Sequence, residues 1–343
     1  MRSAVRPMVG LVGVGRMGQG ILKNLLKHGH AVSAYDIGQE PREEAARLGA
    51  RVAGSSGDAG RGSHVVFLSL PGPAEVQSVV CGPGGLVESM GRGGLILDTT
   101  TGDPETSRRI RHEAAARGIT YLDAPLSGGA AAAEQGSLTV MVGGAAADFE
   151  RALPLLRCIG HQIFHVGDTG AGIALKLCHQ LLVYNSLAAL CEALTVGVQM
   201  GLDPEVAARV FAKSSASSMI ITLFGPKLAA RSFDQVIFPL RLALKDQTLF
   251  LGMAQQAGTP APLGTAVETF FRAAAAQGYG DLDMSAVLQV FEQLAGRSHR
   301  RGSPLGPDDP RPAARSVASA TSARRRSHQR TGARRAVRRR PRS

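Results

Sequence analysis

Apolar residues in the first half of the chain fall into short runs separated by helix-like stretches. The first run is MVGLVGV (8–14), and a helix-like stretch follows it and ends at Gly29. Short β-branched runs that alternate with helices are typical of buried parallel strands in βαβ units, so we expect a doubly wound α/β sheet. The other runs expected to be strands are HAVSAYD (30–36), HVVFLSLP (64–71), GLILDTT (94–100), GITYLDAP (118–125) and SLTVMVGG (137–144).

The strand pattern ends near Gly167, and helical patterns follow. Residues 173–201 form one long apolar segment, and its apolarity all round indicates a helix that is buried on most faces. Asp103 followed by Pro104, and Asp203 followed by Pro204, are typical of the first turn of a helix. Further amphipathic helices are expected over 238–258 and 263–280, so the second half is predicted to be an all-helical domain.

Charge divides the chain into a near-neutral body and a basic tail. We expect a sheet domain over 1–166, a helical domain over 167–296 and a tail over 297–343. The tail holds fifteen Arg and two Asp, so its net charge of +13 exceeds the +12 of the whole chain. With so few apolar residues, the tail is expected to be disordered. A nucleic-acid partner is therefore expected only through this tail.

The cysteines and the apolar segments predict a cytoplasmic protein without a membrane partner. Cys81, Cys158, Cys178 and Cys191 have no metal-ligand spacing and apolar neighbours, which indicates free buried thiols, no metal site and a reducing compartment. The N-terminal apolar run is too short for a signal peptide. The longest uncharged stretch of the long helix, residues 177–191, is shorter than the roughly 20 residues that span a membrane.

A glycine pattern marks the turn after the first strand. Gly13, Gly15 and Gly18 stand as Gly-x-Gly-x-x-Gly between a predicted strand and a predicted helix. This spacing allows a tight turn, close approach of a pyrophosphate and close packing of the helix, as in a Rossmann dinucleotide site. Asp36 ends the second strand, where a carboxylate binds the adenosine ribose and repels the 2′-phosphate of NADP. The pattern therefore favours NAD over NADP, although Asp36 alone is also compatible with an ordinary turn.

A second glycine-rich segment follows the predicted strand at 118–125. Ser127, Gly128 and Gly129 leave a hydroxyl group and backbone N–H groups uncovered. Such a concavity suits a carboxylate or a carbonyl oxygen. Taken by itself, the segment favours a plain loop over a binding site.

Polar side chains interrupt the long apolar helix near its start. Lys176, His179 and Gln180 stand at i, i+3 and i+4, so they project from one face. Partial burial and the positive helix end lower the pKa of a lysine, and a neutral or charged amine can exchange the proton that accompanies hydride transfer. The alternative is a lysine that extends to solvent at a domain edge. Lys245 and Asp246, in another apolar helix, are compatible with an ion pair at an edge.

These motifs together resemble the β-hydroxyacid dehydrogenase family over residues 8–296. The resemblance rests on five segments in family order: the glycine segment to Asp36, DTTTGDP (98–104), DAPLSGG (123–129) with the residues after it, GAGIALKLCHQ (170–180) and PLRLALKDQ (239–247). It implies that Lys176 is the general acid/base and that Ser127, Gly128 and Gly129 bind the acid end of the substrate. His179 and Gln180 are also expected to bind the substrate. It also implies that the cofactor is bound by Gly13, Val14, Gly15, Arg16, Met17, Gly18, Asp36, Leu70, Pro71, Thr101 and Lys245.

The resemblance implies an NAD-dependent dehydrogenase of small β-hydroxy acids, such as 3-hydroxyisobutyrate or 2-hydroxy-3-oxopropionate, that forms a homodimer or homotetramer. One departure is His179-Gln180, where many members carry Asn-Asn. This pair is more similar to the branch that acts on four-carbon sugar acids such as L-threonate or erythronate. Two further alternatives are an imine-reducing enzyme, whose relatives replace the lysine, and a non-catalytic protein that binds nucleic acid through its tail.

Overall fold

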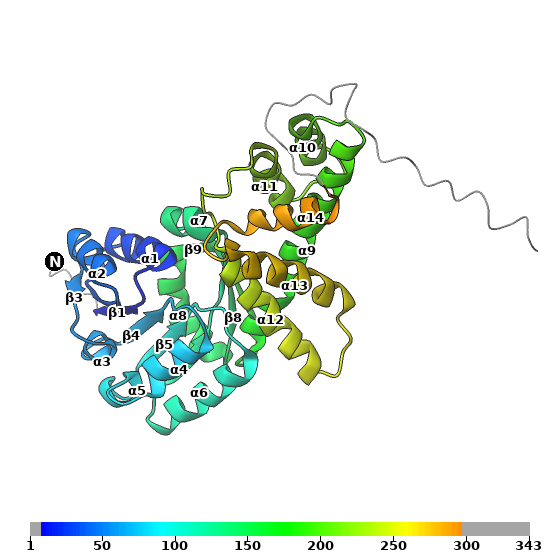
Figure 1. The fold of residues 1–343 in the computed structure, drawn as a ribbon. Coiled ribbons are helices and arrows are strands. Elements are labelled where there is room, and N and C mark those ends of the chain that lie inside the picture. The colour runs from blue at the N-terminus through cyan, green and yellow to red at the C-terminus, as the bar shows by residue number, and fades with distance from the viewer. Residues whose placement is uncertain (1–7, 297–343) are drawn as a thin grey trace, which may run out of the picture. The chain divides into compact units, whose positions relative to one another are not determined.

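The strands of the first half form one mixed sheet in a computed structural model of the chain (Figure 1). The structure describes residues 8–296, so the predictions for the tail at 297–343 lie outside the described residues. The strand order is β3-β2-β1-β4-β5-β6-β8-β7, and β9 pairs with β8. The strands are β1 (Val9–Val12), β2 (Val32–Tyr35), β3 (Arg51–Val52), β4 (Val65–Leu68), β5 (Leu95–Asp98), β6 (Thr120–Asp123), β7 (Leu126–Ser127), β8 (Leu138–Gly143) and β9 (Gly160–Gly167).

Strands β1 to β6 pair in parallel and are covered by helices on both faces. Alternate side chains enter opposite cores: Phe67 packs in one cluster with Leu22, whereas Val66 and Leu68 pack in the other with Val76. The predicted doubly wound sheet is therefore confirmed. The helices of this half are α1 (Arg16–Lys27), α2 (Gln39–Arg47), α3 (Ser56–Gly60), α4 (Pro73–Cys81), α5 (Leu86–Ser89), α6 (Pro104–Ala116), α7 (Gly129–Gln135) and α8 (Ala146–Ile159).

Strand β8 departs from the expected parallel order, because it runs antiparallel to β6 and β7. Strands β6 and β7 act as one strand interrupted near Pro125, a residue that has no N–H to donate to a ladder. The antiparallel register begins with Asp123 opposite Gly143. It continues unchanged to Ser127 opposite Thr139. The chain thus returns as a wide hairpin whose connection contains α7, instead of crossing over to a parallel strand.

Strand β9 was not predicted from the sequence. It pairs in parallel with β8, and most of its side chains are exposed or half-buried, including Phe164. The segment therefore lacks the continuous apolar run that marks the buried strands. It comes directly before the helical half, and the predicted domain boundary between 166 and 167 stays a prediction.

The second half is helical, as predicted, and has a core of its own. Tyr184, Phe224, Leu240 and Phe271 are almost fully buried in this core. The helix α11 was not predicted, and it contains Pro226. The helices are α9 (Ala171–Gln199), α10 (Pro204–Lys213), α11 (Met219–Ala230), α12 (Leu240–Gln256), α13 (Pro262–Ala274) and α14 (Leu288–Leu294), with a π turn at Ala275–Tyr279 and a 3-10 turn at Met284–Val287.

The two predicted helix starts are confirmed. The side chain of Asp103 accepts a hydrogen bond from the backbone N–H of Thr106 at the start of α6. Asp203 accepts from the N–H groups of Glu205 and Val206 at the start of α10. Each carboxylate satisfies N–H groups that have no partner within the helix.

The expectation that the long helix is buried on most faces is wrong for this chain. Leu182 and Val196 of α9 are 69% and 58% exposed. Within residues 8–296, α9 is the one helix long and apolar enough to cross a membrane by length and composition, and 39% of its most apolar window is buried. The helix packs against the sheet and against other helices but keeps an uncovered apolar face. The absence of a membrane partner stays a prediction.

All four cysteines carry free thiols, but only two of them are buried. Cys158 and Cys191 lie in the interior, whereas Cys81 is half-buried and Cys178 is exposed. The expectation of four buried thiols is wrong because Cys178 occupies a face of α9 that nothing in the described chain covers. Apolar neighbours in sequence do not reveal which face of a helix a residue occupies.

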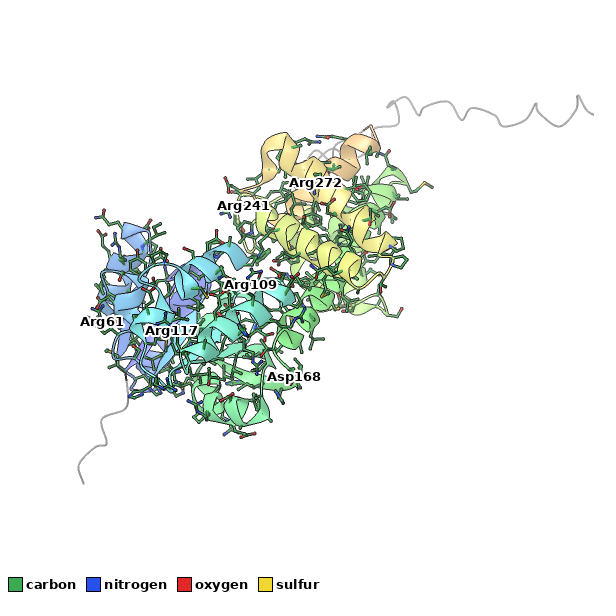
Figure 2. All side chains as sticks on the ribbon, turned by 90° about the horizontal axis from the view of Figure 1, so that it is seen from below. Arg61, Arg109, Arg117, Asp168, Arg241 and Arg272 are labelled. Atoms are coloured by element: carbon green, nitrogen blue, oxygen red, sulfur yellow. The ribbon has the colours of Figure 1, made fainter. Side chains whose placement is uncertain are left out.

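Two exposed arginines of the helical half, Arg241 and Arg272, are paired with acids nearby. Arg241 contacts Asp281 with 2.8 Å between the side-chain nitrogen and oxygen, and Arg272 contacts Glu268 one helical turn away. Figure 2 labels both arginines, which lie on the helical half. Such surface pairs contribute little to stability. They do, however, balance charge locally, in agreement with the near-neutral body calculated from the sequence.

Helices α1 and α7 approach each other closely through small residues. A Cβ atom at Gly20 would lie 2.6 Å from the carbonyl carbon of Ala133, so the two backbones leave no room for a side chain. The buried amide of Asn24 donates hydrogen bonds to the carbonyl oxygens of Ala133 and Glu134 at 2.8 and 3.2 Å. These bonds satisfy carbonyl groups near the end of α7.

A buried aspartate joins the sheet to the long helix. Asp123, the last residue of β6, accepts hydrogen bonds from the N–H groups of Gly170 and Ile173 at 2.7 and 3.0 Å. Burial raises the pKa of Asp123, and these backbone hydrogen bonds oppose the increase. A Cβ atom at Gly172 would lie 2.9 Å from the carboxylate, so only glycine fits beside it. Asp123 therefore caps α9 from outside the helix and fixes where the helix starts.

We expect Asp123→Ala to lower the free energy of unfolding by about 1–3 kcal/mol, because two buried N–H groups lose their acceptor. Urea denaturation of the full chain measures this change. Asp281→Ala is the matched control, since Asp281 is exposed and its loss is expected to cost less than about 1 kcal/mol. Equal stability of the two variants would contradict the capping role of Asp123.

Candidate active site

The glycine turn after β1 combines tight packing with one open position. A Cβ atom at Gly13, whose φ is +93°, would lie 2.1 Å from the carbonyl oxygen of Ser69. A Cβ atom at Gly18 would lie 2.1 Å from the carbonyl oxygen of Gly13. At Gly15 nothing lies within 4 Å of that position, and no side chain caps the start of α1. The protein's own packing thus explains Gly13 and Gly18, whereas the open space at Gly15 fits a phosphate group against the helix start.

Asp36 is held in a fixed position beside this turn. One carboxylate oxygen accepts a hydrogen bond from the N–H of Val14 at 2.7 Å, and the other accepts from the N–H of Gly38 at 2.8 Å. The next residue, Ile37, is 90% exposed and apolar. A carboxylate fixed at the end of β2 fits the ribose hydroxyls of a bound dinucleotide.

The side chains of the other predicted residues of the glycine turn, Arg16 and Met17, contact different parts of the protein. The guanidinium group of Arg16 donates a hydrogen bond to the carbonyl oxygen of Val236 in the helical half, at 2.5 Å. Met17 is half-buried and packs against the core of the sheet. Only the backbone of Met17 is therefore placed to contribute to a phosphate site.

The ends of β4 and β5 form the adjoining part of the site. The N–H of Leu70 donates to the hydroxyl oxygen of Thr100 at 3.1 Å. Beneath them, buried Asp98 accepts from the N–H of Thr100 at 2.9 Å and from the hydroxyl of Tyr121 at 2.6 Å. Burial raises the pKa of Asp98 to about 6, although the hydrogen bond from Tyr121 opposes this increase. The supporting role of Asp98 was not predicted from the sequence, although its position at the end of a strand was a signal for it.

Lys245 of α12 connects the helical half to these strand ends. Its ammonium group donates hydrogen bonds to the carbonyl oxygens of Pro71 and Thr101 at 3.0 and 2.8 Å. It also lies 3.0 Å from a carboxylate oxygen of Asp246. The structure therefore brings the predicted residues Pro71, Thr101 and Lys245 together.

Lys176 lies inside the protein, near the start of α9. Its side chain is 7% exposed, and its amine donates a hydrogen bond to Gln180 Oε1 at 3.0 Å. Burial lowers the pKa of Lys176 to about 8, with Asp246 opposing the decrease and Lys245 adding to it. Extension of this lysine to solvent is thereby contradicted. An amine that titrates near neutral pH can both donate and accept a proton.

His179 connects the helix to the second glycine-rich segment. Its Nε2 lies 3.1 Å from the hydroxyl oxygen of Ser127, and its Nδ1 lies 3.0 Å from Gln180 Oε1. Burial lowers the pKa of His179, and the neighbouring charge of Lys176 lowers it further. Gly128 and Gly129, with φ of +126° and +70°, follow Ser127 and are exposed. The structure thus brings the predicted substrate-binding side chains together.

A buried carboxylate, that of Asp246, completes the network, and its role was not predicted from the sequence. Asp246 is 2% exposed, so it does not form an ion pair at an edge. It accepts hydrogen bonds from Gln180 Nε2 at 2.6 Å and from the hydroxyl of Tyr184 at 2.9 Å. Lys176, Gln180 and Tyr184 are spaced by four residues on one face of α9. This spacing was a signal that the face has a polar partner such as Asp246.

The polar contacts form a continuous chain across the site. Lys176 contacts Gln180, Gln180 contacts Asp246, and Asp246 contacts Lys245. Lys245 then reaches the strand ends next to Thr101. This chain places a titratable amine in the same network as the strand ends that border the glycine turn. The arrangement suits proton exchange beside a bound dinucleotide.

Comparison with known families matches both halves of the chain. Residues 8–167 match the NAD binding domain of 6-phosphogluconate dehydrogenase. Residues 170–291 match a family described as NAD-binding of NADP-dependent 3-hydroxyisobutyrate dehydrogenase. The two matches together cover nearly all of the described residues.

Individual relatives are similar over their whole length. The chain is 37% identical to 2-(hydroxymethyl)glutarate dehydrogenase of Eubacterium barkeri, over 84% of this chain and 96% of that one. It is 36% identical to 3-hydroxyisobutyrate dehydrogenase of Pseudomonas aeruginosa, over 82% and 98%. A crystal structure of 3-hydroxyisobutyrate dehydrogenase from Salmonella typhimurium superposes with a TM-score of 0.77 at 27% identity, over 83% of this chain and 100% of that one. The chain therefore belongs to the β-hydroxyacid dehydrogenase family and is an NAD(P)-dependent oxidoreductase that acts on CH–OH groups.

Proposed function

We propose that the protein interconverts small β-hydroxy acids and their oxo forms, by oxidation of acids of the 3-hydroxyisobutyrate type or by reduction of oxo acids of the 2-hydroxy-3-oxopropionate type, with NAD as the cofactor. The observation that supports this most is the buried amine of Lys176, whose pKa of about 8 suits a general base at neutral pH. The family membership supports the reaction class, and the substrate and the nucleotide are the parts proposed.

Separate residues accept the proton, position the amine and bind the acid end of the substrate. NAD held at the glycine turn and by Asp36 would supply the acceptor for the hydride that leaves the hydroxyl-bearing carbon. The neutral amine of Lys176 accepts the hydroxyl proton, so the alcohol becomes a carbonyl group. Gln180 holds the amine through its Oε1 atom, and the backbone at Gly128 and Gly129 receives the acid end of the substrate. Reduction reverses these steps, with the ammonium group as the acid.

The preference for NAD follows from the surroundings of Asp36. Both carboxylate oxygens are held by backbone N–H groups, so the charge cannot move away from a ribose bound beside it. The adjacent Ile37 offers no positive charge to a 2′-phosphate. The family matches include a description with NADP, so the preference for NAD rests on Asp36 and its neighbour Ile37 and not on the family.

A four-carbon sugar acid such as L-threonate or erythronate is the second candidate substrate. His179 and Gln180 support it, because their hydrogen-bonding groups adjoin Ser127 and Lys176. A substrate with several hydroxyl groups has more partners for such a polar surface than one with a methyl group.

We also propose that the chain forms a homodimer or homotetramer through the uncovered face of α9 and α10. Leu182, Val196 and Val210 are each more than half exposed on these helices. Large exposed apolar surfaces of this kind are typical of interfaces between subunits.

We expect Lys176→Ala to lower kcat for the oxidation of a C3 or C4 hydroxy acid by at least about 100-fold, since the reaction loses its proton acceptor. Steady-state kinetics with NAD measure this loss. Lys213→Ala removes an exposed lysine and serves as the control. Turnover like that of the unmodified enzyme in Lys176→Ala would rule out the proposed base.

The pH dependence of oxidation should follow the titration of Lys176. The amine must be neutral in order to accept a proton, so kcat/KM should rise with pH and level off above about 8. Asp246→Asn removes a charge that raises this pKa, so the rise should move to lower pH. Lys245→Met removes a charge that lowers it, so the rise should move to higher pH. Shifts of both variants in the same direction would contradict this assignment.

The ratio of kcat/KM with NAD to that with NADP should fall at least about 10-fold in Asp36→Ser, because like charges brought together cost several kcal/mol. The unmodified enzyme should prefer NAD. Glu40→Gln, which removes an exposed carboxylate in α2, is the control for a change in overall charge. A preference for NADP in the unmodified enzyme would refute the role given to Asp36.

A further inference from the structure

A loop of the helical half is closed at its base by backbone hydrogen bonds. Residues 233–238 lie between α11 and α12. The N–H of Asp283 donates to the carbonyl oxygen of Phe233 at 2.9 Å, and the N–H of Met284 donates to the carbonyl oxygen of Phe238 at 2.8 Å. Two neighbouring residues thus bind both ends of loop 233–238, so the base of the loop is fixed.

The carboxylate of Asp283 holds the second half of the loop. Asp283 is fully buried and accepts hydrogen bonds from the N–H groups of Ile237 and Phe238 at 2.7 and 3.2 Å. Two successive N–H groups that share one carboxylate oxygen determine the direction of the backbone there.

Lys227 of α11 holds the first half of the loop. Its ammonium group donates hydrogen bonds to the carbonyl oxygens of Ser232 and Gln235, both at 2.6 Å, and it lies 4.0 Å from the carboxylate of Asp283. The side chain of Lys227 is only 11% exposed, so its charge compensates that of the buried carboxylate. A loop held by this many contacts loses little conformational freedom when a ligand binds beside it.

The tip of the loop meets the glycine turn through Arg16. The carbonyl oxygen of Val236 accepts a hydrogen bond from the guanidinium group of Arg16 at 2.5 Å. Arg16 is the first residue of α1 and follows Gly15, the open position that fits a phosphate group. A guanidinium group has five N–H donors, so the bond to Val236 leaves donors for a phosphate oxygen at the turn.

We propose that loop 233–238 is a preformed clamp that slows the release of the dinucleotide, and that Arg16 connects this clamp to the cofactor phosphates. Lys227 and Asp283 are positioning residues, because they act on the cofactor only through the loop. The inference goes beyond the proposed function. It depends on a dinucleotide at the glycine turn, which the family membership supports, and not on which hydroxy acid is the substrate.

The rate at which a bound nucleotide leaves the full chain tests the clamp. Stopped-flow fluorescence measures this rate with NADH or NADPH, whichever binds more tightly. We expect Arg16→Met to increase the dissociation rate constant at least about 10-fold, because a charged donor is lost. Lys227→Met should increase it about 3- to 10-fold, because the Val236 carbonyl is no longer held in place. Lys227→Arg should be close to the unmodified protein, and Lys213→Met, which removes an exposed lysine of α10, should change nothing.

The double variant tests whether Lys227 acts through Arg16. In the Arg16→Met background, Lys227→Met should change the dissociation rate constant by less than about 2-fold, because the contact that it supports is already lost. Effects that multiply in full, an unchanged rate in either single variant, or binding of neither nucleotide would overturn the inference. If circular dichroism shows that Lys227→Met does not fold, insertion of two glycines between Gln235 and Val236 displaces the same carbonyl and decides in its place.

Hydrogen exchange of the protein without nucleotide tests whether the clamp is preformed. We expect the N–H groups of Ile237 and Phe238 to be protected already, since their acceptor is Asp283 and not the cofactor. Protection that appears only after NADH or NADPH is added would show a loop that forms on binding, which would also overturn the inference.

Discussion

The placement of an amide between two buried charges is the constraint on which the active site depends. Lys176 and Asp246 are both buried, and each would be costly alone. A direct ion pair would stabilise the charged lysine and raise its pKa. The Gln180 amide instead contacts both groups, donating to Asp246 and accepting from Lys176. The charges remain compensated, yet the pKa of Lys176 stays near 8, where proton exchange is possible.

Asp246 also forms an ion pair with Lys245, and Lys245 connects the two halves of the protein. Lys245 contacts Asp246 and also the carbonyl oxygens of Pro71 and Thr101 at the strand ends. Asp123 makes the corresponding connection from the sheet, since it caps the helix that carries Lys176. The active site is therefore built by contacts that cross from the sheet to the helices in both directions.

Much of the fold could be predicted from the sequence because its signals are local. Buried parallel strands such as β4 are short apolar runs, and helix starts such as Asp103 carry a capping residue and a proline. The antiparallel direction of β8 and the exposed edge strand β9 could not be predicted in the same way. Their pairing depends on partners distant in the chain, and the residues of β9 do not form a continuous apolar run.

The candidate site shows the same division. The glycine turn and Lys176 could be named from the sequence, because their residue types and spacing point to their chemistry. Asp98 and Asp246 could not, because a carboxylate acquires its role from what surrounds it after folding. Asp246 is a buried support and not half of a surface ion pair because the folded chain covers it. The sequence alone does not show which side chains become covered.

The close contact between α1 and α7 determines the distance between the cofactor-binding and substrate-binding parts of the site. Helix α1 begins at the glycine turn, and α7 begins directly after Ser127 and Gly128. The gap between these two helix starts is set by backbone against backbone at Gly20, where no methyl group fits. This contact thus fixes the distance between the glycine turn, which faces the cofactor phosphates, and the segment at Ser127 and Gly128, which faces the substrate. A larger residue at position 20 would lengthen the span that cofactor and substrate must bridge, without altering any group that touches either of them.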